Sequence, residues 1–143
     1  LYLTLLLALK SKWQEKTSTT QSKYQNNKLS TEQTSHFSSL LNNLIATEQV
    51  YLDPQLTLPR LAKRMGITHT QLSQLLNDHY QMNFKQFINT QRVTKAKESL
   101  KAYPEMPVEE IAELCGFSAS STFYSTFKQQ TGMTPNQYRT SKI

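Results

Sequence analysis

Glycine and cysteine are scarce in this chain of 143 residues, which contains three glycines and one cysteine. The single cysteine, Cys115, excludes an internal disulfide and fits a reducing compartment. The sequence contains no glycine-rich phosphate loop and no nucleophile motif, and its three histidines do not have the spacing of metal ligands. We therefore expect no enzymatic activity, no cofactor and no metal ion.

The few glycines that are present all fall within two similar segments. Each segment reads apolar-Ala-x-x-x-Gly-apolar, and the two begin at Leu61 and Ile111, fifty residues apart. The similarity continues beyond the glycines, where Leu72 matches Phe123 and Leu76 matches Phe127. An internal repeat of this kind indicates one structural unit that is used twice.

The repeated pattern is typical of a helix-turn-helix. The small side chains of Ala62 and Ala112 allow a second helix to approach closely, and the following glycine can adopt the left-handed conformation that ends the first helix. Thr68-x-x-Gln71 has the form of a capping box for the next helix, and Ser118 is the expected N-cap in the second unit. An αα-hairpin that serves only for packing would have the same pattern, but its duplication in a basic chain favours DNA binding.

The charge balance is compatible with an acidic partner but does not identify one. The net charge is +6, with a pI of about 9.5. Residues 48–143 contain 11 Lys and Arg against 8 Asp and Glu, so the repeat region contributes only +3. A basic chain can bind nucleic acid or an anionic membrane surface, or can simply be soluble.

The first 47 residues differ in character from the rest of the chain. Residues 1–9 are strongly apolar but shorter than the roughly 20 residues that a spanning helix needs. Lys10, Lys12 and Trp13 follow, as at the cytoplasmic end of a membrane helix. We interpret residues 1–16 as the end of a membrane helix whose anchor begins upstream of Leu1, or alternatively as an N-terminal packing helix. Residues 17–34 are rich in polar side chains and predict a linker.

The remaining sequence predicts helices only. Apolar spacing predicts a leading amphipathic helix over 35–53. Residues 54–143 would then form a double helix-turn-helix domain, with units at about 57–80 and 107–131. A long helix over about 84–102 would join the units, with its apolar residues on one side, and Pro107 would occupy the first position of the following helix. No segment alternates as a strand would, so the expected fold is all-α.

These motifs resemble the DNA-binding domain of AraC/XylS-type transcription regulators over about residues 50–141. The matching motifs are Leu61-Ala62…Gly66, Phe84…Phe87-Ile88…Arg92…Ala96…Leu100, Ile111-Ala112…Gly116-Phe117-Ser118…Ser121-x-Phe123-x-x-x-Phe127-Lys128, and Thr131-Gly132-Met133-Thr134-Pro135…Tyr138-Arg139. The resemblance implies seven helices, in which two helix-turn-helix units enter neighbouring major-groove segments. The leading segments resemble a membrane-anchored subset of the family, in which this domain lies on the cytoplasmic side of the bacterial inner membrane.

The resemblance also implies which side chains read bases. In the first recognition helix they are Thr70, Ser73 and Gln74, and in the second they are Ser120, Ser121 and Ser125. The chain departs from the family pattern at Ser125, where arginine is common, and at Gln81, where glycine is usual. From their charge, we expect five further residues to contact phosphates, or otherwise to act as solubility charges: Lys63, Arg64, Arg92, Lys128 and Arg139.

We therefore predict a sequence-specific DNA-binding regulator of transcription. The expected partner is double-stranded DNA, and RNA polymerase and a second copy of the chain are further candidate partners. The alternative is a helical protein-interaction module that does not bind DNA. Salt would discriminate the two, because DNA binding weakens steeply with ionic strength and a hydrophobic interface does not.

Overall fold

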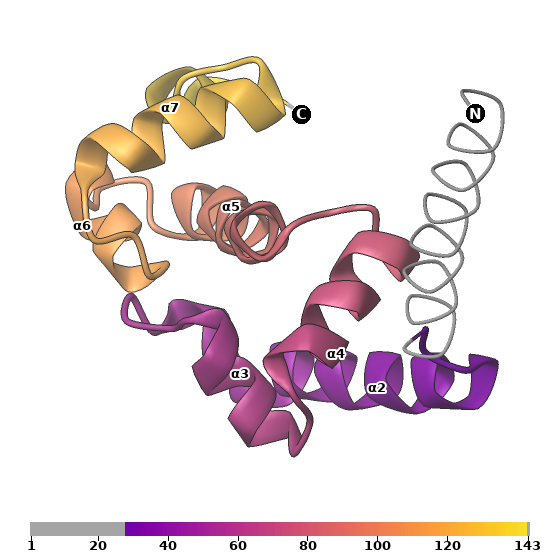
Figure 1. The fold of residues 1–143 in the computed structure, drawn as a ribbon. Coiled ribbons are helices and arrows are strands. Elements are labelled where there is room, and N and C mark those ends of the chain that lie inside the picture. The colour runs from indigo at the N-terminus through magenta and orange to yellow at the C-terminus, as the bar shows by residue number, and fades with distance from the viewer. Residues whose placement is uncertain (1–27, 143) are drawn as a thin grey trace, which may run out of the picture.

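The computed structural model describes residues 28–142, so the predictions for residues 1–16, and for residues 17–27 of the linker, lie outside it. This part of the chain contains helices and no strands, which confirms the predicted all-α fold (Figure 1). No helix within residues 28–142 has the length and apolar character needed to cross a bilayer. The elements are α2 (Thr31–Asn43), η1 (Leu44–Glu48), η2 (Val50–Leu52), α3 (Leu58–Met65), α4 (His69–Gln74), η3 (Leu75–His79), α5 (Phe84–Ala102), α6 (Val108–Leu114), α7 (Ser120–Thr131) and α8 (Pro135–Thr140).

The leading helix begins earlier and ends earlier than its apolar pattern predicts. It starts at Thr31 and not at 35, because Ser30 and Gln33 form a capping box with hydrogen bonds of 3.0 and 3.1 Å. It does not continue as one helix to 53. The π-helical turn η1 follows it, Gln49 adopts a left-handed conformation with φ 48°, and the short 3-10 turn η2 then leads into the first unit.

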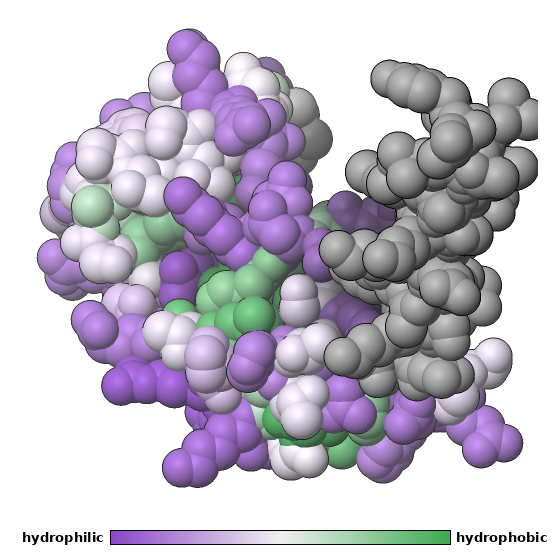
Figure 2. Space-filling model, viewed as in Figure 1, coloured by the Kyte–Doolittle hydropathy of each residue, from purple (hydrophilic) through white to green (hydrophobic). Residues whose placement is uncertain are grey.

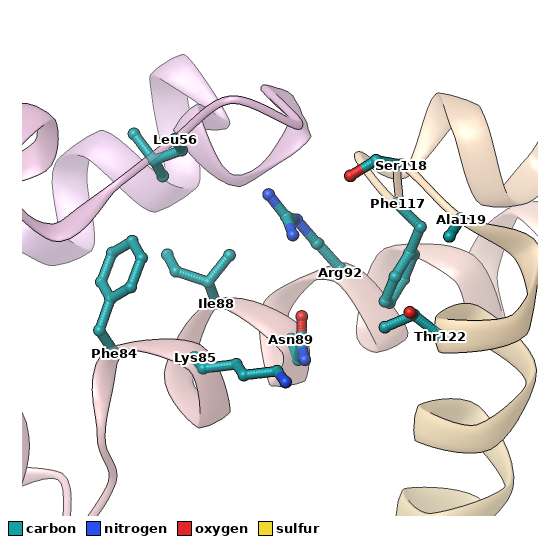
Figure 3. Close-up of a pocket in the computed structure, with 10 residues that line it drawn as sticks. All are labelled: Leu56, Phe84, Lys85, Ile88, Asn89, Arg92, Phe117, Ser118, Ala119 and Thr122. Carbon is teal, nitrogen blue, oxygen red and sulfur yellow. The ribbon is translucent and has the colours of Figure 1, made fainter.

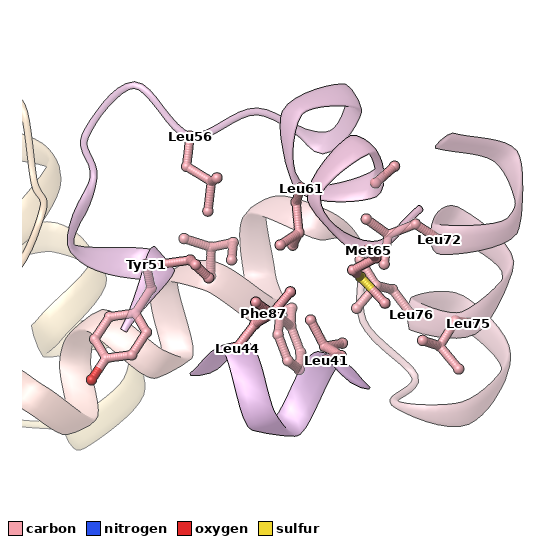
Figure 4. Packing of buried hydrophobic residues seen from close by; sticks show 13 residues of the cluster. Leu41, Leu44, Tyr51, Leu56, Leu61, Met65, Leu72, Leu75, Leu76 and Phe87 are labelled. Carbon is pink, nitrogen blue, oxygen red and sulfur yellow. The ribbon is translucent and has the colours of Figure 1, made fainter. Parts of the chain in front are cut away.

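The first helix-turn-helix unit has a hydrophobic core of its own (Figure 4). Leu41 of α2 and Leu44 of η1 lie beside Phe87 at the beginning of α5, and side chains of α3 and α4 complete the core. Leu61, Leu72 and Leu76 are completely buried in this core, which places both helices of the unit against α2 and α5. The leading helix is therefore an integral part of the first unit.

A second, separate core holds α6, α7 and α8 against the other half of α5. Phe123 and Phe127 of α7 are fully buried, with ring centroids 5.6 Å apart, and Phe127 contacts Tyr138 of α8 edge-on. Figure 1 shows α5 in the middle of the molecule, between the two units, and Figure 2 shows apolar surface exposed between them.

The prediction that the apolar residues of α5 share one side is wrong. Phe87 and Ile88 are buried in the first core, whereas Val93, Ala96 and Leu100 are buried in the second. At about 100° per residue, the mean directions of the two sets differ by roughly 160°. The helix therefore buries two nearly opposite faces, one in each unit.

The two units meet where Arg92 of α5 reaches the leading segment. Its Nε donates a hydrogen bond of 2.7 Å to the carbonyl oxygen of Tyr51, and its Nη2 donates one of 2.9 Å to the carbonyl oxygen of Asp53. The backbone of Gly116 packs against the same Tyr51 oxygen, and a Cβ at this glycine would lie 2.5 Å from it. This contact fixes the turn of the second unit against the first.

Candidate nucleic-acid interface

The two units make the same turn, as their shared sequence motif predicts. Gly66 and Gly116 have φ values of 70° and 92°, which L side chains rarely adopt. The amide of Ile67 donates to the carbonyl of Ala62 at 3.1 Å, and that of Phe117 donates to Ala112 at 3.0 Å. These bonds join residues five apart and are typical of Schellman motifs. Each motif ends the first helix of its unit and turns the chain into the second helix.

The first recognition helix, α4, begins with the predicted capping box of Thr68 and Gln71. Thr70 is exposed, while Ser73 and Gln74 are half-buried. The Oε1 atom of Gln74 is buried and accepts no hydrogen bond from any residue in the range 28–142. Gln74 also lines one pocket with Lys28 and other residues of the leading segment. The side chain that is expected to read a base thus has an unused acceptor beside the start of α2.

The second recognition helix, α7, is capped differently from the prediction. Its N-cap is Ala119 and not Ser118, and no side chain accepts a hydrogen bond from the first turn. The physical reason is that Ser118 lies one residue too early for its hydroxyl to reach the free amides of that turn. Three predicted base-reading side chains are exposed on this helix: Ser120, Ser121 and Ser125.

The basic residues predicted to contact phosphates fall into two groups. Lys63 and Lys128 are exposed and form no ion pair with another described residue. The other three bind within the protein: Arg64 pairs with Glu48, Arg92 holds the carbonyls described above, and Arg139 Nη2 donates to the Met106 carbonyl at 2.6 Å. Burial lowers the pKa of Arg92, although the charge of Asp53 opposes this.

The turn after the first recognition helix accommodates the unusual residue at position 81. Gln81 has φ 56°, in the left-handed region where glycine carries no steric penalty. Its Nε2 donates a 2.8 Å hydrogen bond to the carbonyl of Asp78. This local bond partly offsets the strain of a non-glycine residue there.

Sequence reasoning did not single out two polar residues on α5, Lys85 and Asn89. Both line a pocket that lies between the units, together with the first turn of α7 (Figure 3). Their i, i+4 spacing places them on the same side of the helix, which the sequence already indicated. Because the opposing wall comes from residues 117–122, the pocket itself could not be predicted from local pattern.

Comparison with known proteins identifies the family. Residues 61–141 match the family model described as a helix-turn-helix domain, which covers both units. The chain belongs to the AraC-type helix-turn-helix family. This confirms the resemblance that the sequence motifs indicated, and an AraC-type domain is a DNA-binding domain of transcription regulators.

Proteins and solved structures that are similar to this chain come from several bacteria. The uncharacterized HTH-type transcriptional regulator YpdC of Escherichia coli is 35% identical over 88 residues, which are 62% of this chain and 30% of YpdC. The C-terminal domain of the two-component response regulator yesN from Fusobacterium nucleatum is 32% identical with a TM-score of 0.63, over 71% of this chain and 96% of that one.

The same fold occurs in the DNA-binding domain of the transcription factor AdpA, solved in complex with a target DNA. The TM-score is 0.62 at 23% identity, over 72% of this chain and 88% of that one. The chain spans only a minor part of the curated relatives that it matches, 30% of YpdC and 12% of the Staphylococcus aureus regulators. The AraC-type domain is thus the part of such proteins to which the similarity applies.

Proposed function

We propose that the domain binds a specific duplex DNA sequence with both units and serves a regulator of transcription. The observation that carries this proposal is the pair of matching Schellman turns, which present α4 and α7 as recognition helices on one rigid scaffold. Two such helices about 34 Å apart can enter successive major-groove segments on one face of DNA. The same family membership supports our prediction that the domain is not an enzyme.

Footprinting on a selected high-affinity site tests this directly. We expect two protected clusters about 10 base pairs apart, and affinity that falls steeply as salt rises. A single short cluster would contradict the use of both units. Tight binding to a protein partner that salt leaves unchanged, without DNA binding, would instead support the interaction-module alternative.

Six residues on the recognition helices are the proposed base readers. They are Thr70, Ser73 and Gln74 on α4, and Ser120, Ser121 and Ser125 on α7. Gln74 is the strongest reader of these, because an amide can pair with adenine through two hydrogen bonds while hydroxyls discriminate poorly. Because the Oε1 atom of Gln74 is buried, this side chain must turn outward before its amide can pair with a base.

The basic residues divide by what their side chains already bind. We assign phosphate contacts to Lys63 and Lys128, which are exposed. The charge of Arg64 is offset by its ion pair with Glu48, and Arg92 and Arg139 already donate to backbone carbonyls of other segments. We therefore assign Arg92 and Arg139 to positioning the units and not to phosphate contact.

We further propose that the full-length protein is tethered to the bacterial inner membrane with this domain in the cytoplasm. The support is in the sequence, where an apolar run at 1–9 is followed by positive and aromatic residues at 10–16. Fractionation of full-length protein followed by a carbonate wash tests the tether, and recovery in the soluble fraction would contradict it. RNA polymerase and a second copy of the chain stay predicted partners.

A further inference from the structure

A polar pocket of about 380 Å³ lies between the first recognition helix and the segment that leads into α2. One side is formed by that leading segment, including Lys28 and Gln33, and the other side by α4, including Gln71 and Gln74. Among the described residues that line the pocket, Lys28 is the only cation, and there is no carboxylate. The pocket thus places one ammonium group beside the helix that is proposed to read bases.

Gln74, on the α4 side, has a polar atom that the described residues leave unsatisfied. Its Oε1 atom is buried and accepts no hydrogen bond from residues 28–142. An unpaired buried acceptor costs more free energy than an ordinary hydrogen bond contributes, so buried polar atoms are nearly always paired. We therefore expect a donor from the surroundings of this pocket to reach the oxygen in the folded domain.

The two other glutamines of the pocket are already held in place. The Oε1 atom of Gln33 accepts a 3.0 Å hydrogen bond from the amide of Ser30, and that of Gln71 accepts one of 3.0 Å from the amide of Thr68. Each bond belongs to a capping box at the start of a helix. Neither side chain can turn toward Gln74 without breaking its capping box.

Lys28 is free to supply the missing donor. The residue is exposed, and its ammonium forms no ion pair with another described residue. The neighbouring Leu29 packs against the first core, which holds the backbone of residue 28 at the edge of the pocket. The flexible stem of lysine allows the ammonium to move within the pocket. A hydrogen bond from an ammonium is roughly twice as strong as one between neutral groups, which favours Lys28 as the donor.

We propose that Lys28 is a positioning residue for the base-reading side chain of Gln74. Its ammonium donates to the Oε1 atom in the DNA-free domain and holds the amide toward the leading segment. The amide must turn outward to pair with a base, so this contact opposes base reading and is given up when the cognate base pair is bound. The inference rests on the proposed function, and it makes Lys28 a determinant of how strongly the first unit prefers its base pair.

The affinities of the whole chain for a cognate and a non-specific duplex test this role through their ratio. Lys28→Met removes the donor and should raise the ratio about fivefold, which corresponds to the loss of one hydrogen bond. The ratio cancels the general loss of attraction to phosphates that accompanies removal of a positive charge. Lys28→Arg keeps a cationic donor and should retain the wild-type ratio. Because residue 28 is exposed, both variants should fold.

A double-mutant cycle shows whether Lys28 acts through Gln74. In the Gln74→Ala background, Lys28→Met should leave the ratio unchanged, because no amide oxygen remains to be held. The matched control is Lys128→Met, which removes an exposed lysine of α7 outside the pocket and should weaken both duplexes alike. An unchanged or lowered ratio for Lys28→Met, or an equal rise with and without Gln74, would overturn the proposal.

NMR of the DNA-free protein separates failure of this contact from failure of the proposed function. The side-chain amide signals of Gln74 should shift in Lys28→Met, and should stay close to their wild-type positions in Lys28→Arg and Lys128→Met. Selective DNA binding without a shift in Lys28→Met would overturn only the positioning role. A shift in a chain that selects no duplex sequence would overturn the proposed function, and with it the role of Lys28 in base reading.

Discussion

The Nε atom of Arg92 donates a hydrogen bond of 2.7 Å to the carbonyl oxygen of Tyr51, which lies 41 residues earlier in the chain. Tyr51 belongs to the leading segment and Arg92 to the middle of α5, at the point where the helix passes from the first core to the second. The guanidinium also lies 5.8 Å from the centroid of the Phe117 ring, in the turn of the second unit. One side chain thus contacts three segments whose relative positions set the spacing of the recognition helices.

Replacing Arg92 should destabilise the domain. We expect Arg92→Gln to lower the free energy of unfolding by about 2 kcal/mol, because two hydrogen bonds from a charged group to backbone carbonyls are lost. Urea denaturation measures this. Arg64→Gln is the control, and should cost less than about 1 kcal/mol because its ion pair with Glu48 is exposed. A variant of Arg92 with unchanged stability but a shallower salt dependence of DNA binding would restore the phosphate-contact prediction.

The two turn glycines should differ in their tolerance of alanine. Both have positive φ, so alanine at either position costs roughly 1–2 kcal/mol of backbone strain. A Cβ at Gly66 would meet nothing within 4 Å, whereas one at Gly116 would lie 2.5 Å from the Tyr51 oxygen. Thermal unfolding should therefore show a clearly larger loss for Gly116→Ala than for Gly66→Ala. Equal losses would mean that the two units can separate at little cost.

Gln74 should determine the preference for one base pair. We expect Gln74→Ala to weaken binding to the cognate site by roughly 1–3 kcal/mol and to relax selection at a single position. Lys63→Gln, a phosphate-contact control from the neighbouring helix, should weaken all sequences alike. Binding-site selection with each variant provides the comparison, and an equal loss on every sequence for Gln74→Ala would remove its assignment as a base reader.

Arginine at position 125 should strengthen the contribution of the second unit. Ser125 is exposed on α7, and its hydroxyl donates a 3.2 Å hydrogen bond to the carbonyl of Thr122. Arginine can pair with guanine through two hydrogen bonds, worth roughly 1–3 kcal/mol of discrimination. Selected sites for Ser125→Arg should gain a guanine in the second protected cluster. The same sites for both proteins would show that position 125 does not face the groove.

Alkaline pH should destabilise the domain through Cys115. Burial raises the pKa of this thiol above its ordinary value of 9.0, so the folded state holds the proton more tightly than the unfolded state. Its contribution to stability is full below pH 9 and is lost as pH rises through the folded pKa, with a slope of up to about 1.4 kcal/mol per pH unit. Cys115→Ala lacks this thiol, so the wild type should lose stability relative to the variant as pH rises above 9 in urea titrations. Parallel curves would contradict the prediction.

Local sequence signals predicted the parts of the fold that depend on neighbouring residues. The turn glycines, the capping box at Thr68 and the span of α5 all follow from local residue patterns. The start of α2 at Thr31 could not be predicted, because Ser30 and Gln33 lie in a polar stretch that resembles a linker.

Contacts between distant segments could not be predicted in this way. The carbonyls that Arg92 and Arg139 bind lie 41 and 33 residues away, and backbone acceptors leave no trace in the sequence. Pro107 also serves as the N-cap of α6, one residue outside the position expected for it, because its ψ of 142° is extended. For the candidate site, the exposure of the α7 serines agrees with expectation, whereas the pocket at Asn89 depends on how the two units pack.

Because α5 buries nearly opposite faces in the two cores, it also sets the rotational phase between them. One residue inserted between Ile88 and Val93 would turn the second unit by about 100° around the helix axis and displace it by about 1.5 Å. The two recognition helices would then no longer have the relative orientation of the wild-type protein, although each unit would keep its own core. The length of this helix, counted in single residues, thus sets the relative orientation of the two recognition helices.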